Sequence, residues 1–399
     1  MLAACRTRCQ GIKSMKRRDF SKMIVGATSV GSMMTLPMVK TAAAMTRKLT
    51  TVVDRVDRAH RFEWAKEHFR GFENVLVASF TPDLKNLDEA GIRLDVQKSI
   101  EHGFFSTLIA PAALSQEELK RVMQIAVDEA DGRIAIGFAL HAGPEAETFD
   151  LIEHGEKVGC QHFLLDLPRE GSQEDLYRHG AKYSEATDLG IYLWMAQVHN
   201  FKRFHSSAIP FELFDRMADH PNIIALKVGN MDPAVVFELF ERYNDRMLIG
   251  SMWPNIMPFA IKTYGQQWSG AWTVEALQSP ETPYGTEFFN LMMRGKYEQG
   301  MKLYWSNVAP GFGAMMKMMG RYMASGAHPW ELIKYYQFVV GGNGGRMRVD
   351  AEHPDIPPVS AEDMGFVRGV HKKLRVQTTD LSDKAFDVGR ANWKARLRN

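Results

Sequence analysis

Residues Asn222–Asn230 read NIIALKVGN, and this stretch decides the fold that we expect for the whole chain. Its apolar run, Ile223–Leu226, is too short for a helix core, is rich in β-branched residues and has turn-forming residues on both sides. The pattern predicts a buried strand that ends at Lys227. In a parallel α/β barrel the carboxyl ends of the strands form the active face. Lys227 is therefore a candidate catalytic amine, although an isolated lysine at a strand end more often points into solvent.

Apolar runs of the same kind recur along the chain. They lie near residues 74–79, 103–109, 133–138, 161–167, 190–195, 222–227, 247–250 and 267–272, with segments of helical periodicity between them. Eight strands that alternate with helices predict an α/β fold, a (β/α)8 TIM barrel. A doubly wound open sheet is the competing architecture, but no G-x-G-x-x-G turn follows the first run. We therefore expect the barrel over residues 71–280.

The flanking segments have their own patterns. Residues 1–44 contain Arg17-Arg18, Phe20 and Lys22, then a weakly apolar stretch and three alanines at 42–44. This predicts a signal that exports the folded protein to the periplasm through the twin-arginine translocation machinery. Residues 45–70 are expected to form an N-terminal helical segment. Residues 281–399 are expected to form a helical C-terminal extension, rich in methionine, with a peripheral basic tail.

Composition and motifs argue against nucleic-acid-binding and metal-dependent functions. The formal net charge is +2, and many of the basic residues lie in the leader and in the C-terminal tail, so no footprint for nucleic acid is present. The chain has no C-x-x-C pair and no H-E-x-x-H helix. We expect no metal site and no organic cofactor.

Five segments carry a family resemblance. They are residues 74–82, 114–118, 171–177 and 221–227, and then Gly250 with residues 265–273. In this order and spacing they resemble the dihydrodipicolinate synthase and N-acetylneuraminate lyase family of class I aldolases. The resemblance implies that Lys227 forms a Schiff base with a 2-oxo acid such as pyruvate, that a strand-five tyrosine relays protons, and that the protein is a homo-oligomer.

The chain departs from the family pattern in two places. Where the family has a G-T-T-G-E loop that binds the substrate carboxylate, residues 106–113 read STLIAPAA. In strand five Trp194 takes the place of the family's tyrosine, and Tyr192 lies on the same face one layer deeper. Tyr192 is thus a candidate proton relay, with a packed core tyrosine as the alternative.

Polar residues at predicted strand ends complete the candidate site. We expect substrate binding by Thr107, His141, Asp166 and Ser251. Asp166 lies among leucines and could act as an acid or base, or it could pair with Arg169 and serve only the structure.

The leading function is a Schiff-base lyase, an aldolase or dehydratase that acts on a 2-oxo acid. The alternative is a barrel that has lost its chemistry and binds a small molecule in the periplasm, because the carboxylate-binding loop is missing.

Overall fold

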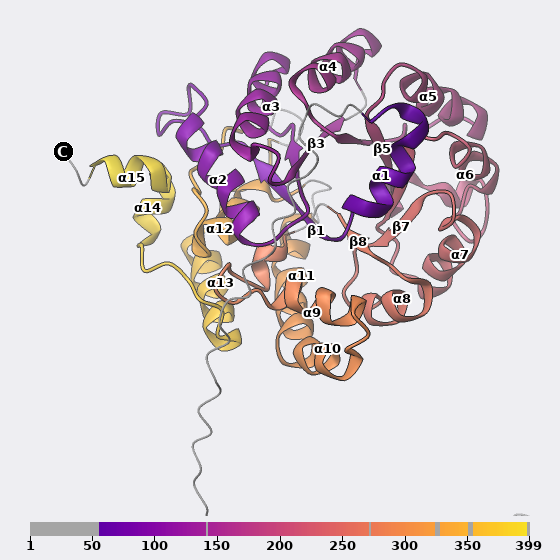
Figure 1. Ribbon diagram of the computed structural model, residues 1–399. Helices are drawn as coiled ribbons and strands as arrows, with labels where there is room; N and C mark the ends of the chain where they lie inside the picture. The colour runs from indigo at the N-terminus through magenta and orange to yellow at the C-terminus, as the bar shows by residue number, and fades with distance from the viewer. Residues whose placement is uncertain (1–55, 141–142, 271–272, 324–327, 350–353, 397–399) are drawn as a thin grey trace, which may run out of the picture. The chain divides into compact units, whose positions relative to one another are not determined.

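The computed structural model describes residues 56–140, 143–270, 273–323, 328–349 and 354–396. Its eight strands run parallel in one sheet, in the order β7-β6-β5-β4-β3-β2-β1-β8. Helices alternate with the strands and surround them (Figure 1). The predicted TIM barrel is confirmed.

Each strand lies within a few residues of the apolar run that predicted it. The strands are β1 (Gly71–Val77), β2 (Ser106–Ala110), β3 (Ala135–Leu140), β4 (His162–Leu165), β5 (Gly190–Met195), β6 (Ile223–Val228), β7 (Leu248–Ser251) and β8 (Trp268–Ser269). The helices between them are α2 (Glu89–Glu101), α3 (Gln116–Ala130), α4 (Glu145–Val158), α5 (Gln173–Glu185), α6 (Phe211–Met217), α7 (Pro233–Tyr243) and α8 (Met257–Tyr264). Capping boxes at Ser115 and Ser172 fix where α3 and α5 begin.

Side chains link β7 to β8. Trp268 donates its indole N–H to the carbonyl of Leu248 (3.2 Å). The carbonyl of Ser251 accepts from the hydroxyl of Ser269 (3.1 Å) and from the amide of Gln266 (2.9 Å). The Trp268 ring lies so close to β7 that a Cβ on Gly250 would come within 2.6 Å of it. Because β8 has only two residues, these contacts supply much of the link between β7 and β8.

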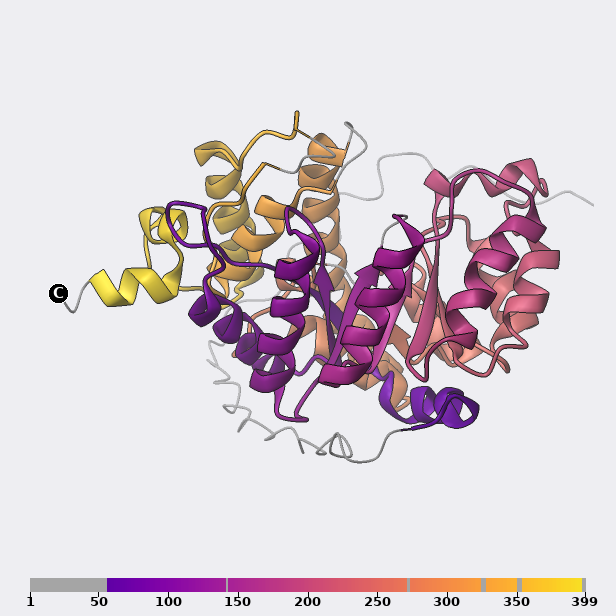
Figure 2. The same ribbon diagram turned by 90° about the horizontal axis from the view of Figure 1, so that it is seen from above.

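An N-terminal helix covers the amino end of the barrel. Helix α1 (Arg61–His68) leads into Phe69, whose ring contacts those of Phe105, His162, Tyr192 and Trp268. Phe69, Tyr192 and Trp268 are fully buried. Helix α1 lies at the amino end of the strands (Figure 2). In a parallel barrel the active face is the opposite, carboxyl end, which we call the mouth.

The C-terminal extension is helical, as expected. It contains α9 (Tyr284–Met293), α10 (Tyr297–Leu303), a π-helical turn (Tyr304–Val308), α11 (Ala309–Met323), α12 (Trp330–Val339), α13 (Ala361–Leu374), α14 (Asp383–Val388) and α15 (Arg390–Arg396). The expectation of a peripheral basic tail is corrected for α14 and α15. Phe386 is fully buried, and Arg390 donates to the carbonyls of Phe338 and Gly342.

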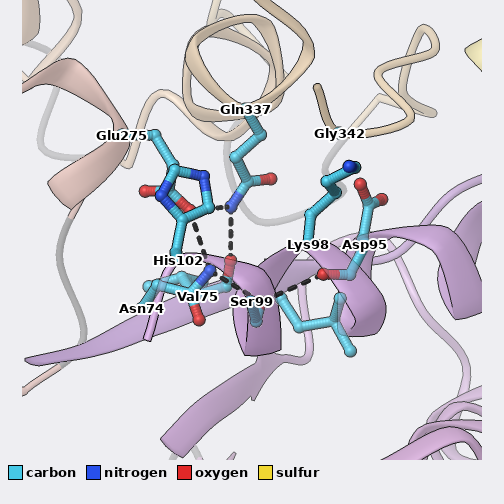
Figure 3. A pocket seen from close by; sticks show the side chains of 10 residues that line it. Asn74, Val75, Asp95, Lys98, Ser99, His102, Glu275, Gln337 and Gly342 are labelled. Atoms are coloured by element: carbon cyan, nitrogen blue, oxygen red, sulfur yellow. Dashed lines mark hydrogen bonds between the residues drawn. The ribbon is translucent and has the colours of Figure 1, made fainter. Parts of the chain in front are cut away.

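A buried polar cluster joins the extension to the barrel wall (Figure 3). It consists of Asn74, Ser99, Glu275 and Gln337 around a cavity of about 10 Å³, enough for about one water molecule. Asn74 donates to Glu275 (2.8 Å) and Ser99 (3.0 Å), and Gln337 donates to the carbonyl of Val75 (2.6 Å). Burial raises the pKa of Glu275 to about 7. This cluster faces the helices and not the barrel interior.

Candidate active site

Lys227 lies on the inner face of β6, one residue before the strand ends. Its neighbours in the sheet are Trp194 on β5 and Gly250 on β7. The side chain is buried, with 6% of its surface exposed, and its Nζ lies 5.8 Å from the centroid of the Trp194 ring. The strand thus brings the amine to the mouth of the barrel against an aromatic wall, as the sequence indicated.

Burial sets the ionisation of this amine. Desolvation lowers the pKa of Lys227 to about 8, while the carboxylates of Glu73 and Asp166 act in the opposite direction. A much larger fraction of the amine is therefore neutral near neutral pH than for an exposed lysine. A neutral amine is the form that attacks a carbonyl carbon.

Tyr192 is buried one layer below Lys227. It pairs with Ala225, two residues before Lys227 on β6. Its hydroxyl donates to Glu73 Oε2 (2.7 Å), and burial followed by the charge of Glu73 raises its pKa well above the usual value. The structure therefore places Tyr192 in the barrel core and points its hydroxyl at a carboxylate. Its role as proton relay stays a prediction.

Glu73 and His162 complete a polar network that the sequence did not indicate. Glu73 is fully buried on β1, and its Oε1 lies 2.8 Å from His162 Nε2, which is also 3.3 Å from Ser106 Oγ. Gly137 makes room for the imidazole, since a Cβ there would lie 2.3 Å from Nε2. A charged residue inside the buried strand Gly71–Val77 was the available signal.

Asp166 lies at the mouth, at the end of β4, and is 4% exposed. Its carboxylate accepts two hydrogen bonds from Arg169 (2.7 and 2.6 Å) and one from His199 Nε2 (2.8 Å). The pairing with Arg169 is the structural alternative that the sequence left open, and the charge of Asp166 also acts on Lys227. Asp166 therefore pairs with Arg169, and its role in substrate binding stays a prediction.

His199 belongs to the expanded loop after β5, and sequence reasoning missed it. His199 Nδ1 lies 3.1 Å from the backbone nitrogen of Ala196 and 3.2 Å from its carbonyl oxygen, and Nε2 lies 2.8 Å from Asp166 Oδ1. The ring is fully buried and lies edge-on to Trp194 at 5.2 Å. Arg169 lies 5.8 Å from the same Trp194 ring. This loop packs against the aromatic wall beside Lys227.

The remaining predicted site residues do not join Lys227. Thr107 pairs with Asn74, which faces the helices, while its neighbour Leu108 packs inside the barrel. Expecting Thr107 to bind substrate is corrected for this reason, because neighbouring strand residues face opposite sides. Ser251 pairs with the outward-facing Val228, and its hydroxyl accepts from the N–H of Trp253 (3.3 Å). His141 lies outside the described residues.

Lys334 is a second buried lysine. It lies on α12, is 1% exposed, and its pKa is also lowered to about 8 by burial. Its ammonium donates to the carbonyl of Ala78 (2.8 Å) and to the hydroxyl of Ser79 (3.0 Å) at the end of β1. These bonds tie the extension to the barrel and occupy the nitrogen.

Within the described ranges, no three His, Cys, Asp or Glu side chains are arranged to hold a metal ion. In the same ranges no helix is both long and apolar enough to cross a membrane.

Comparison with curated proteins gives relatives that include several enzymes named 4-hydroxy-tetrahydrodipicolinate synthase. The 4-hydroxy-tetrahydrodipicolinate synthase of Methanopyrus kandleri is 27% identical over 183 residues, which are 44% of this chain and 59% of that protein. The enzyme of the same name from Phenylobacterium zucineum is 26% identical over 242 residues, 58% of this chain and 78% of that protein. The match to the first relative thus spans less than two thirds of that protein's length.

Solved structures share the fold. N-acetylneuraminate lyase from Fusobacterium nucleatum, complexed with pyruvate, superposes with a TM-score of 0.58 at 16% identity over 77% of this chain and 97% of that chain. Dihydrodipicolinate synthase from Aquifex aeolicus superposes with a TM-score of 0.59 at 17% identity over 78% and 100%. The model of the dihydrodipicolinate synthetase family matches residues 68–266, which include every strand except β8. Over these residues, just under half of the chain, the sequence matches the dihydrodipicolinate synthetase family.

Proposed function

We propose that this protein is a Schiff-base lyase that acts on a 2-oxo acid, as an aldolase or a dehydratase. The observation that carries the proposal is Lys227, a buried amine with a lowered pKa at the carboxyl end of β6. The match of residues 68–266 to the dihydrodipicolinate synthetase family supports the same chemistry.

The chemistry follows from the state of the amine. Neutral Lys227 attacks the keto carbon, a C–N bond forms, and the carbonyl oxygen leaves as water. The resulting protonated imine withdraws electrons from the neighbouring carbon. A bond from that carbon to carbon or hydrogen can then break or form, with the electron pair held as an enamine. In a dehydratase the enamine then expels a hydroxyl from the next carbon, and the hydroxyl takes up a proton and leaves as water.

The substrate carboxylate needs donors that differ from those of the family. Residues 106–113 lack the Thr-Thr pair, and Thr107 faces the helices. The indole N–H of Trp194 is a replacement, because its Nε1 is buried and has no partner within the described ranges. Its ring is also the one beside Lys227. We therefore assign Trp194 to the carboxylate of the bound 2-oxo acid.

Borohydride trapping tests the proposal. The purified protein is incubated with a panel of 2-oxo acids, reduced with borohydride, weighed intact and digested for peptide mapping. We expect an adduct with the mass of the keto acid less one oxygen atom, on Lys227 and absent from Lys227→Ala. Lys334 is an internal control, since it is also buried but lies on α12, where its nitrogen donates to the end of β1.

An adduct on Lys334 and on surface lysines as well as on Lys227 would show non-specific reaction. Binding of panel members without any adduct would favour the alternative function, a barrel that binds a small molecule without chemistry.

We also propose that the protein acts in the periplasm as a homo-oligomer. The support for export is the twin-arginine pattern at Arg17-Arg18, which lies outside the described residues. The support for self-association is the family resemblance. Light scattering on the purified mature protein measures the second point, and a monomeric mass at micromolar concentration would contradict it.

A further inference from the structure

Glu73 places a carboxylate inside the barrel, where charge is costly. The side chain is fully buried on the inner face of β1. A buried carboxylate costs several kcal/mol unless a cation lies close to it. The hydroxyl of Tyr192 and Nε2 of His162 approach its two oxygens at 2.7 and 2.8 Å. A tyrosine hydroxyl orients the carboxylate but does not neutralise it.

Two basic groups can carry the compensating proton, His162 and Lys227. His162 contacts Glu73 directly and is fully buried, and its Nδ1 has no partner within the described part of the chain. Lys227 lies two residues beyond Ala225, which pairs with Tyr192, so the Glu73–Tyr192 contact lies in the layer beneath the lysine.

The other charges around Lys227 are already balanced. Asp166 also faces the lysine, but Arg169 and His199 bind its two oxygens. Of the two carboxylates that act on Lys227, Glu73 has the larger effect. Its charge raises the pKa of the amine, whereas burial lowers it. An imidazole with an unpartnered Nδ1 is better accommodated as a neutral ring, since a second N–H there would be a buried donor without an acceptor.

We propose that the carboxylate of Glu73, oriented by Tyr192 and His162, is the counter-ion of Lys227 and of the protonated imine formed on it. The consequence for catalysis rests on the proposed Schiff-base function. Glu73 is in this sense a positioning residue that acts through Lys227.

The balance of charge explains why such a counter-ion is needed. Burial alone favours the neutral amine, which helps attack, but it also favours a neutral imine, which is a poor electron sink. From ammonium to protonated imine the nitrogen keeps one positive charge, and one water leaves. A fixed negative charge beneath the nitrogen stabilises both charged forms equally and thereby keeps the imine protonated.

Carbamylation by cyanate measures the pKa of the Lys227 amine without any substrate. The rate of carbamylation at Lys227, followed by peptide mapping, is recorded against pH for the wild type and for Glu73→Gln. We expect the midpoint of the Glu73→Gln profile to move to lower pH by about one unit, because an attractive charge is lost. Glu275→Gln is the matched control, since it removes a buried carboxyl outside the barrel interior, and it should leave the midpoint in place.

His162→Gln distinguishes the two basic groups even if Glu73→Gln does not fold. If His162 is neutral, its replacement leaves the midpoint within a few tenths of a unit. If His162 is the cation, its loss leaves Glu73 unbalanced and raises the midpoint by about one unit. That rise, or an unchanged midpoint in Glu73→Gln, would overturn the inference.

A second measurement uses the reaction itself. Exchange of the methyl protons of pyruvate in D₂O requires the protonated imine, and we expect Glu73→Gln to slow it at least tenfold at saturating pyruvate. If the wild type forms no imine, the proposed lyase function fails, but the carbamylation profile still decides whether Glu73 is the counter-ion.

Discussion

Lys227 and Lys334 are both buried and both have a pKa lowered to about 8, yet only one is arranged for attack on a carbonyl. Lys334 donates to a backbone carbonyl and to a serine hydroxyl. Lys227 lies against the face of Trp194 at the mouth of the barrel. The contrast illustrates that a shifted pKa alone does not identify a nucleophile, whereas its position in the fold adds the missing criterion.

The pH dependence of imine formation follows from the pKa of Lys227. Because the neutral amine attacks, the rate of borohydride trapping should rise with pH and level off above about pH 8. For a lysine with an ordinary pKa near 10.5 the rate would continue to rise about tenfold per unit beyond pH 9. Trapping rates measured from pH 6 to 10 at saturating 2-oxo acid check this, and a rise that persists above pH 9 would contradict it.

Trp194 provides a second test at single-residue resolution. Trp194→Phe keeps an aromatic ring beside Lys227 but removes the unpartnered indole N–H. Loss of one hydrogen bond to a carboxylate costs about 1.5–3 kcal/mol, so the KM for the 2-oxo acid should rise about tenfold or more. The maximal rate of trapping should fall much less. Equal KM values for the two proteins would show that other donors bind the carboxylate.

Strand β1 connects the barrel interior to the C-terminal extension. Strand β1 carries Glu73 on its inner face and Asn74 on its outer face, so one strand serves both the barrel interior and the polar cluster under the extension. Helix α12 reaches the same strand through Gln337 and Lys334. A shift of the extension would therefore be transmitted to the barrel through β1.

Glu275 makes this junction sensitive to pH. Its pKa is raised to about 7 by burial, so the folded protein binds a proton that the unfolded chain releases above its ordinary value of 4.5. Stability therefore falls as the pH rises from about 4.5 to about 7, and the loss stays constant above pH 7. Glu275→Gln should gain about 1–3 kcal/mol relative to the wild type at pH 8 and little at pH 4.5.

Urea unfolding of both proteins at pH 4.5, 6 and 8 measures this difference. Glu117→Gln, at an exposed position on α3, is the control for the loss of one carboxylate. A stability difference between Glu275→Gln and the wild type that does not change with pH would contradict the prediction.

The sequence predicted the strands and the place of Lys227 well, but it did not predict which way each strand side chain points. Apolar runs located all eight strands, and the position of Lys227 in its run placed it at the mouth, because both are local properties. Thr107 was assigned to the wrong face because a shift of one residue reverses the direction of a side chain. Position alone did not show that Thr107 faces out while Ser106 faces in.

Glu73 and His199 were missed for a different reason. Glu73 contacts His162 and Tyr192, which lie on distant strands. His199 contacts Asp166 and Ala196 only once the loop after β5 has folded. No local sequence pattern therefore predicts these contacts. A charged residue within a fully buried strand is the clue that remains. Such a residue needs a partner in the core, and the partner becomes visible only when the strands are assembled.

At the scale of the whole molecule, the two ends of the barrel lie against different parts of the chain. Helix α1 and Phe69 cover the amino end, while α12 and the rings of His328 and Trp330 lie near the mouth beside Trp194. A protein that the twin-arginine machinery carries must be folded before export.

Export itself is tested through the leader. Replacing both Arg17 and Arg18 by lysine should abolish processing and leave the full-length precursor in the cytoplasm, with at least a tenfold loss of periplasmic protein. Cell fractionation and immunoblotting measure this, with Lys16→Arg as the control that leaves the arginine pair intact. Normal processing of the double variant would show that another route exports the protein, or that residues 1–44 are not an export signal.

The most direct measurement of the central claim is a crystal structure of the protein incubated with pyruvate at pH 8. We predict continuous electron density from Lys227 Nζ to the keto carbon, with the pyruvate carboxylate within hydrogen-bond distance of the Trp194 indole nitrogen and Glu73 still bound to Tyr192. Pyruvate bound at the mouth without a covalent bond to Lys227, or joined to another lysine, would contradict the account.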